Sequence, residues 1–255
     1  MSPRLSLSLA LALALGLAAA PVLAQDAPDP QPRWTLGLLA IERDAPYRQL
    51  DEDLLVVPLV RFEGERFYLR GLRGGVVLAE SGGFEFGGFL QARGDGYDAA
   101  DSPYLAGMAD RKFSLDAGVA ASWRVPRIGQ FEASLATDML DRSGGQEAEV
   151  SWTGLVRAAG WQFLPSLALR WQSQDMVDYY YGVRAGEAIV GRPAYAPGSA
   201  LFPEVSLLAT RPLGERWQLF ARAGHTWLPS EVTDSPLVDQ DSRTSVLVGL
   251  GYTFD

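Results

Sequence analysis

The stretch Arg243-Thr-Ser-Val-Leu-Val-Gly-Leu-Gly-Tyr-Thr-Phe254-Asp255, at the end of this 255-residue chain, decides the fold class. Every second residue from Val246 to Phe254 is apolar or aromatic, and mostly small or polar residues alternate with them. An extended strand has a period of two residues, so the pattern predicts a β-strand with one apolar face and one small or polar face. Similar alternations recur through the chain, which is typical of a transmembrane β-barrel of an outer membrane.

The N-terminus has the features of an export signal. Arg4 precedes a Leu- and Ala-rich run from Leu5 to Ala20, and Val22-Leu-Ala24 fits a cleavage site. The run is short for a spanning helix of about 20 residues, and its small-residue exit favours a cleaved signal peptide over residues 1–24. Three prolines indicate a disordered lead-in over 25–33, which leaves 34–255 for the barrel.

Charge and cysteine content exclude several classes of protein. The chain has 22 basic and 31 acidic residues, and loss of Arg4 with the signal leaves 21 and 31, a net charge of −10. Nucleic-acid binding needs clustered Lys and Arg, so we expect no nucleic-acid partner. Without cysteine there is neither a disulfide framework nor a thiolate metal site. No metal and no cofactor are expected.

Twelve segments carry the strand pattern, and short turns alternate with long polar loops as in outer-membrane barrels. The glycine-rich segment 66–83 carries the weakest pattern, and it must hold two strands if the up-and-down order is kept. Ten strands is the alternative. We predict strands at 34–42, 54–62, 66–71, 75–80, 84–94, 112–124, 130–140, 148–159, 164–173, 200–211, 216–227 and 243–254.

Aromatic residues gather near the predicted strand ends. Amphipathic rings prefer the two membrane interfaces, so the tryptophans predict two girdles, although tryptophan also favours strands in general. Tyr252 and Phe254 are expected to form the signal read by the barrel-assembly machinery, with Phe254 penultimate rather than terminal. The periplasmic girdle is predicted to hold Trp34, Trp123, Trp161 and Trp217, and the external girdle Trp152, Trp171 and Trp227.

Charged residues on the inward face allow three interpretations. They can neutralise one another in a filled lumen, line a narrow pore, or include a pair of carboxylates that acts as acid and base. The filled lumen is favoured because an unpaired buried ion is costly. The set is Glu85, Arg93, Asp116, Glu132, Asp138, Glu149, Arg170, Glu204 and Arg222.

His225 is the single histidine, so a histidine-assisted hydrolase would have to use it. Its phase places it on the lipid side near the external girdle, where an interfacial ring is the simpler interpretation. A lipid hydrolase would need a nearby serine, such as Ser242 or Ser245. No spacing typical of a serine hydrolase supports this, and we predict a protein that is not an enzyme.

The long loops are acidic, yet none has the full spacing of a calcium loop. They are expected to be solvated surfaces that meet the divalent cations of lipopolysaccharide, which with membrane lipid is an expected partner. The residues are Asp95, Asp98, Asp101 and Asp110 in one loop and Glu231, Asp234, Asp239 and Asp241 in another.

Several segments resemble the MipA/OmpV family of Gram-negative outer-membrane proteins, over essentially the whole mature chain. The resemblance implies a scaffold in the cell outer membrane whose partners are a lytic transglycosylase and a murein synthase. The matching segments are Leu54 to Phe62, Phe67-Tyr-Leu69, Leu105 to Arg111, Tyr179 to Val183, Glu187-Ala188, Arg192 to Tyr195 and Ser235 to Val238.

The tyrosine-rich segment of this resemblance is expected to be a structured external loop that plugs the barrel mouth, with a ligand site as the alternative. The protein as a whole is expected to be a monomeric scaffold. A small-solute pore or an adhesin-like surface protein is the alternative, and a lipid-modifying enzyme is the third. The loop residues are Tyr179, Tyr180, Tyr181, Gly182, Glu187, Arg192, Pro193 and Tyr195.

Overall fold

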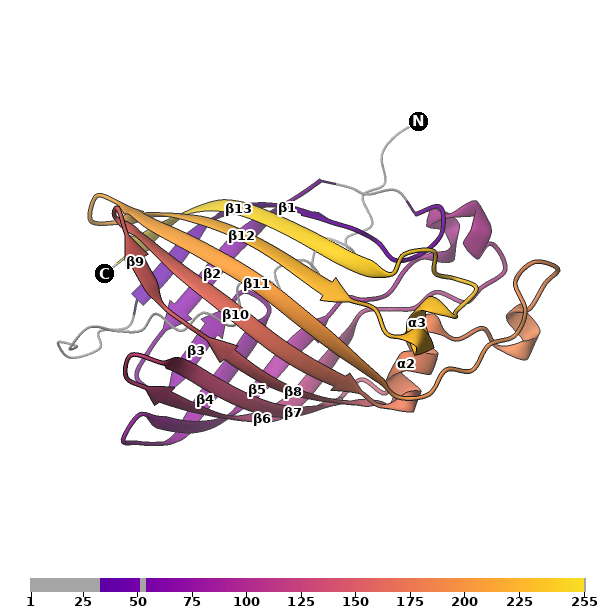
Figure 1. The fold of residues 1–255 in the computed structure, drawn as a ribbon, viewed down its shortest axis with the longest axis horizontal. Helices are drawn as coiled ribbons and strands as arrows, with labels where there is room; N and C mark the ends of the chain where they lie inside the picture. The colour runs from indigo at the N-terminus through magenta and orange to yellow at the C-terminus, as the bar shows by residue number, and fades with distance from the viewer. Residues whose placement is uncertain (1–32, 51–53, 255) are drawn as a thin grey trace.

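The computed structural model describes residues 33–50 and 54–254, so the predicted signal peptide and most of the lead-in lie outside the described residues. Over this part of the chain, a closed antiparallel barrel of twelve strands winds in up-and-down order (Figure 1). β8 and β9 count as one strand, because both pair with β10 and only Gly154 and Leu155 separate them. The twelve-strand prediction is confirmed, and the alternative of ten strands is wrong.

The strand bounds agree with the predicted segments to within a few residues, and Arg33 belongs to the first strand rather than to the lead-in. The strands are β1 (Arg33–Arg43), β2 (Leu55–Glu63), β3 (Phe67–Arg70), β4 (Arg73–Ser81), β5 (Phe84–Arg93), β6 (Ser114–Val125), β7 (Gly129–Asp138), β8 (Gln146–Thr153), β9 (Val156–Ala158), β10 (Trp161–Gln172), β11 (Ala200–Leu213), β12 (Trp217–Trp227) and β13 (Ser242–Phe254). The helices are η2 (Ala99–Asp101), η3 (Pro103–Leu105), α2 (Gln174–Tyr181), η4 (Ala185–Glu187) and α3 (Ser230–Thr233).

The first and last strands close the barrel. β1 pairs with β13 from Trp34 opposite Phe254 to Arg43 opposite Ser245. Closure satisfies the backbone groups at the seam, which hydrocarbon would otherwise leave without partners. The two-residue alternation of β13 therefore separates the outside of the barrel from the inside.

One stretch of the inner wall is apolar rather than polar. Leu247, which interrupts the polar face of β13, is buried in it. Gly249 makes room for this cluster, because an added Cβ would lie 2.2 Å from the Leu39 side chain. The cluster consists of Leu39, Ile41, Leu55, Val57, Leu59, Phe220 and Leu247.

The β3–β4 hairpin, which the weak segment 66–83 forms, is shorter than its neighbours. Its tip is held to β2 by a hydrogen bond from Gly71 N to Val60 O of 3.1 Å. Among the residues that the structure describes, Leu55 to Leu59 of β2 pair with β1 on one side and with no strand on the other. Alternate residues of a strand direct their polar groups to the same side, so Pro58 faces the free edge with Val60. Because proline has no N–H, it leaves no unpaired donor there.

The two ends of the barrel differ. Residues 44–50 with 54, 94–113, 139–145, 173–199 and 228–241 belong to long connections at one end, here called the loop end, which carries α2 and α3 (Figure 1). Short turns connect the strands at the opposite end, here called the turn end. Long loops face outward and short turns face the periplasm in outer-membrane barrels. None of the helices in the described ranges is long and apolar enough to span a membrane.

Candidate functional site

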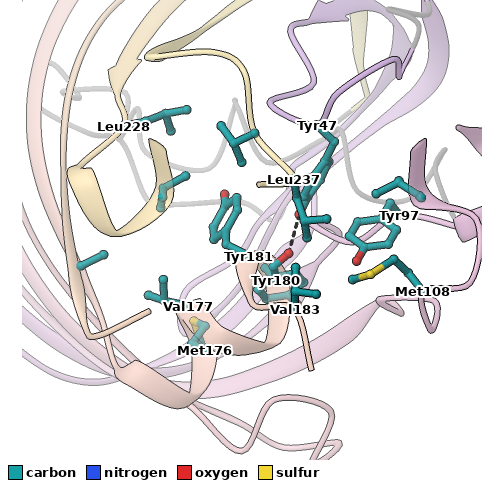
Figure 2. Packing of buried hydrophobic residues seen from close by; sticks show 14 of the residues in the cluster. Tyr47, Tyr97, Met108, Met176, Val177, Tyr180, Tyr181, Val183, Leu228 and Leu237 are labelled. Carbon is teal, nitrogen blue, oxygen red and sulfur yellow. Dashed lines mark hydrogen bonds between the residues drawn. The ribbon is translucent and has the colours of Figure 1, made fainter. Parts of the chain in front are cut away.

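Four of the long connections meet in a hydrophobic core at the loop end (Figure 2). Three of them are consecutive around the barrel, between β10 and β11, β12 and β13, and β1 and β2, whereas the fourth, between β5 and β6, rises from the opposite side. A core that they share therefore crosses the mouth, and we call it the plug. Its buried residues are Tyr47, Tyr97, Leu105, Met108, Met176, Val177, Tyr180, Tyr181, Val183, Ala200, Phe202, Leu228, Val232, Leu237 and Val238.

The helix α2 supplies the centre of the plug. Its buried residues recur with helical spacing, Met176 and Val177 being followed one turn later by Tyr180 and Tyr181. Gly182 ends the helix, and an added Cβ there would lie 2.4 Å from the carbonyl oxygen of Asp178. The sequence predicted a loop for this segment, and the helix was not predicted.

A buried ion pair joins two connections inside the plug. The guanidinium of Arg111 donates to both carboxylate oxygens of Glu187, at 3.1 and 2.9 Å. The backbone N–H groups of Ala109 and Arg184 donate to the same carboxylate. Burial alone would raise the pKa of Glu187, but these hydrogen bonds lower it to about 2. The carboxylate is therefore a charged anchor for both loops.

A second arginine ties the same loops together through backbone carbonyls. Arg192 is 1% exposed and donates to the carbonyl oxygens of Tyr104, Ala106 and Glu187. The Ser235 hydroxyl donates to Tyr181 O at 2.6 Å. Residues from five of the segments that carry the family resemblance are thus brought together in the plug.

The other residues expected in the structured loop lie around this centre. Tyr195 forms a β-bridge with Val183 and donates its hydroxyl to Glu231 O at 3.0 Å. The Tyr179 hydroxyl accepts from the backbone N–H of Lys112. Pro193 is exposed and lies outside the hydrophobic core.

Inside the barrel, inward charges form ion pairs around a cavity of ≈ 200 Å³. The pairs support a mutually neutralised lumen. Asp138 differs, because it accepts hydrogen bonds from Ser114 and Ser143 at the loop end of β7. The pairs are Arg73 with Glu132, Arg93 with Asp116 and Glu147, Arg170 with Glu149, and Arg222 with Glu204.

Asp95, expected on a solvated surface, lies instead beneath the plug among arginines. Arg93 contacts one of its oxygens at 3.3 Å, while Arg43 and Arg243 approach the other at 3.7 and 3.8 Å. Burial alone would raise the pKa of Asp95, but Arg243, Arg93 and Arg43 lower it to about 2. The prediction of a solvated residue is wrong, because Asp95, two residues after the end of β5, lines the internal cavity.

The structure places six of the seven tryptophans at the predicted ends of their strands, and it moves Trp152. Phe131 pairs with both Trp123 and Trp152, and the Trp152 ring donates to Ile128 O in the turn between β6 and β7. Trp152 therefore lies at the turn end, not in the external girdle. The reason is the stagger between neighbouring strands. β9 continues beyond the turn-end limit of β7, so the middle of the predicted strand 148–159 lies near the turn end of the barrel.

The position of His225 gives no support to a catalytic dyad. Its ring packs edge-on against Trp227, with centroids 4.7 Å apart, and lies 3.3 Å from the hydroxyl of Thr244. Ser245 lines the internal cavity, on the opposite face of the wall. The Ser242 hydroxyl donates to Asp241 instead.

Fold and plug together define a class: a transmembrane β-barrel whose mouth is crossed by its own loops. A model of the family described as MltA-interacting protein MipA matches residues 36–254, and the chain belongs to this family.

Curated relatives place the protein in the outer membrane. The outer membrane protein YiaT of Escherichia coli O157:H7 is 31% identical over 222 residues, covering 86% of this chain and 90% of YiaT. The MltA-interacting protein of Escherichia coli (strain K12) is 30% identical over 212 residues, covering 82% and 85%. Among solved structures, the NanC porin gives a TM-score of 0.44 at 9% identity, covering 85% of this chain and 98% of that one. The chain is an outer-membrane protein of the MipA/OmpV type.

Proposed function

We propose that this protein is a closed barrel that serves as an outer-membrane scaffold for a periplasmic murein-remodelling enzyme. The observation that carries the proposal is the plug, since a barrel with a crossed mouth and an ion-paired lumen is poorly suited to free diffusion. The function of such a barrel is then binding by its surfaces rather than passage through its lumen. The 30% identical relative named MltA-interacting protein supports a lytic transglycosylase as the partner.

The turn end is the surface that a periplasmic partner could reach. Its turns are short, and the one between β6 and β7 exposes Ile128, an apolar side chain that is 55% accessible. Trp152 packs beside this turn through its hydrogen bond to Ile128 O. Apolar and aromatic groups of this kind commonly form the centre of a protein interface.

Affinity capture from detergent-solubilised envelopes, followed by mass spectrometry, tests the scaffold. The tagged wild type should recover a lytic transglycosylase, and Ile128→Glu should recover much less of it. Val190→Glu, at a fully exposed loop-end residue, is the matched control and should behave as the wild type. Equal recovery with Ile128→Glu, or no murein enzyme with the wild type, would contradict the proposal.

A gated passage for small solutes is the second candidate, and the internal cavity favours it. Such a passage would require the plug to move, because the loops that form it meet across the mouth. Single-channel recording separates the two: a scaffold stays closed, whereas a gated passage shows discrete openings.

A further inference from the structure

Arg43 and Arg243 share one side of the lumen immediately beneath the plug. They come from β1 and β13, the two strands that close the barrel, and both line the internal cavity. Their NH1 atoms approach the same oxygen of Asp95, at 3.7 and 3.8 Å. One carboxylate thus faces two guanidinium groups.

The two arginines approach their carboxylate less closely than the other arginines of the lumen approach theirs. Arg93, Arg170 and Arg222 each donate a hydrogen bond of 2.7–2.9 Å to a carboxylate. In the described part of the chain, the side chains of Arg43 and Arg243 make no hydrogen bond shorter than their contacts with Asp95. The Arg93 guanidinium also competes for Asp95 while holding Asp116 and Glu147. This corner of the cavity therefore has hydrogen-bond donors and positive charge to spare.

The floor beside the arginines is apolar. Ile41 precedes Arg43 by two residues on β1, and Leu247 follows Arg243 by four on β13, so the strand period points all four side chains inward. Both apolar side chains line the same cavity as the arginines. Fixed donors beside an apolar wall are the usual composition of a small-molecule site.

We propose that Arg43 and Arg243 bind the carboxylate of a small organic acid whose apolar part lies against Ile41 and Leu247. A carboxylate accepts from two guanidinium groups at once, and it balances the charge that Asp95 leaves uncompensated. The cavity of ≈ 200 Å³ limits the ligand to a small molecule. This site is independent of whether a periplasmic enzyme docks on the turn end.

Benzoate is a suitable probe, and benzyl alcohol is its uncharged counterpart of similar shape. Equilibrium dialysis would use the full mature barrel in detergent, with binding to empty micelles subtracted. Benzoate should bind the wild type, and benzyl alcohol should bind about tenfold more weakly or less, because a hydrogen bond to a charged group is worth more than a neutral one. No saturable benzoate binding, or equal binding of the two compounds, would overturn the proposal.

Variants locate the site. Arg43→Gln combined with Arg243→Gln should weaken benzoate binding by about tenfold or more, while Arg157→Gln at the exposed turn end should leave it unchanged. Arg43→Gln and Arg243→Gln, each made alone, keep one guanidinium beside Asp95 and should each weaken binding, which preserves the test if the double variant fails to fold. Wild-type affinity in both single variants, or in a folded double variant, would contradict the assignment.

Discussion

The carboxylate of Glu187 and the guanidinium of Arg111 meet face to face inside the plug, although 76 residues separate them in the chain. Their side chains are 9% and 1% exposed. The pair fastens the connection between β5 and β6 to the connection between β10 and β11. Breaking a buried pair by removing one partner typically costs about 3–5 kcal/mol, because the other charge is left without compensation.

Glu187→Ala should loosen the plug without unfolding the barrel, whose backbone ladder does not depend on this pair. We expect trypsin to cut after the exposed Arg184 about a hundredfold faster than in the wild type, as local opening becomes easier. Asp175→Ala, at an exposed position of α2, is the control and should be cut at the wild-type rate. Equal rates for all three proteins would mean that the pair does not hold the plug.

Acid should open the plug of the wild type. Glu187 and Asp95 have folded pKa values of about 2, below their usual values of 4.5 and 3.8. A lowered folded pKa gives stability that is complete above the usual value and is lost as the pH falls toward the folded one. Near-ultraviolet circular dichroism of the plug tyrosines should therefore fade between about pH 4.5 and 2. Glu187→Gln should flatten this dependence, and identical titrations of variant and wild type would contradict the assignment.

Adjacent residues of β7 test the inside–outside register. Leu135 is 61% exposed on the outer face, whereas Ser134 lines the internal cavity. Leu135→Arg should impair folding into bilayers, because a cation on the lipid face near the midplane costs about 2–4 kcal/mol. Ser134→Arg should be tolerated better, since its side chain can reach water and the lumen carboxylates. The heat-dependent shift in gel mobility reports the folded fraction, and equal impairment would show the register to be wrong.

The closing strand offers a test of assembly. Phe254 is 44% exposed, pairs with Trp34 and packs edge-on against Tyr252, with ring centroids 4.8 Å apart. Phe254→Ala should lower the amount of protein in the outer membrane, because the end of the alternating apolar face is lost at the seam. Deletion of Asp255 should have little effect. Immunoblots of outer-membrane fractions measure both, and the reverse order of effects would refute a role for Phe254.

The barrel was predictable because its signal is local. The two-residue alternation along β6 or β13 is set by the strand itself. The pattern of β3 and β4 is poor, but they were predicted because an up-and-down order requires two strands in this segment. The position of Trp152 between the loop end and the turn end of the barrel was not predictable. That position depends on the stagger between neighbouring strands, which no single segment of sequence encodes.

The plug was only partly predictable. The tyrosine-rich segment indicated a structured loop, yet its helix and the partners of Glu187 and Arg192 depend on loops far away in sequence. Asp95 looked like a surface residue because its arginine partners come from β1, β5 and β13. The signal that could have revealed α2 is the helical spacing of its apolar residues, since Tyr180 and Tyr181 follow Met176 and Val177 by one helical turn.

Single-channel recording in planar bilayers tests the closed barrel most directly. The wild type should carry no steady current at neutral pH, because the plug crosses its mouth. A variant in which a short Gly-Ser linker replaces residues 174–199 removes α2 and should carry a steady current. A wild type that conducts steadily, at the same level as this variant, would contradict the account.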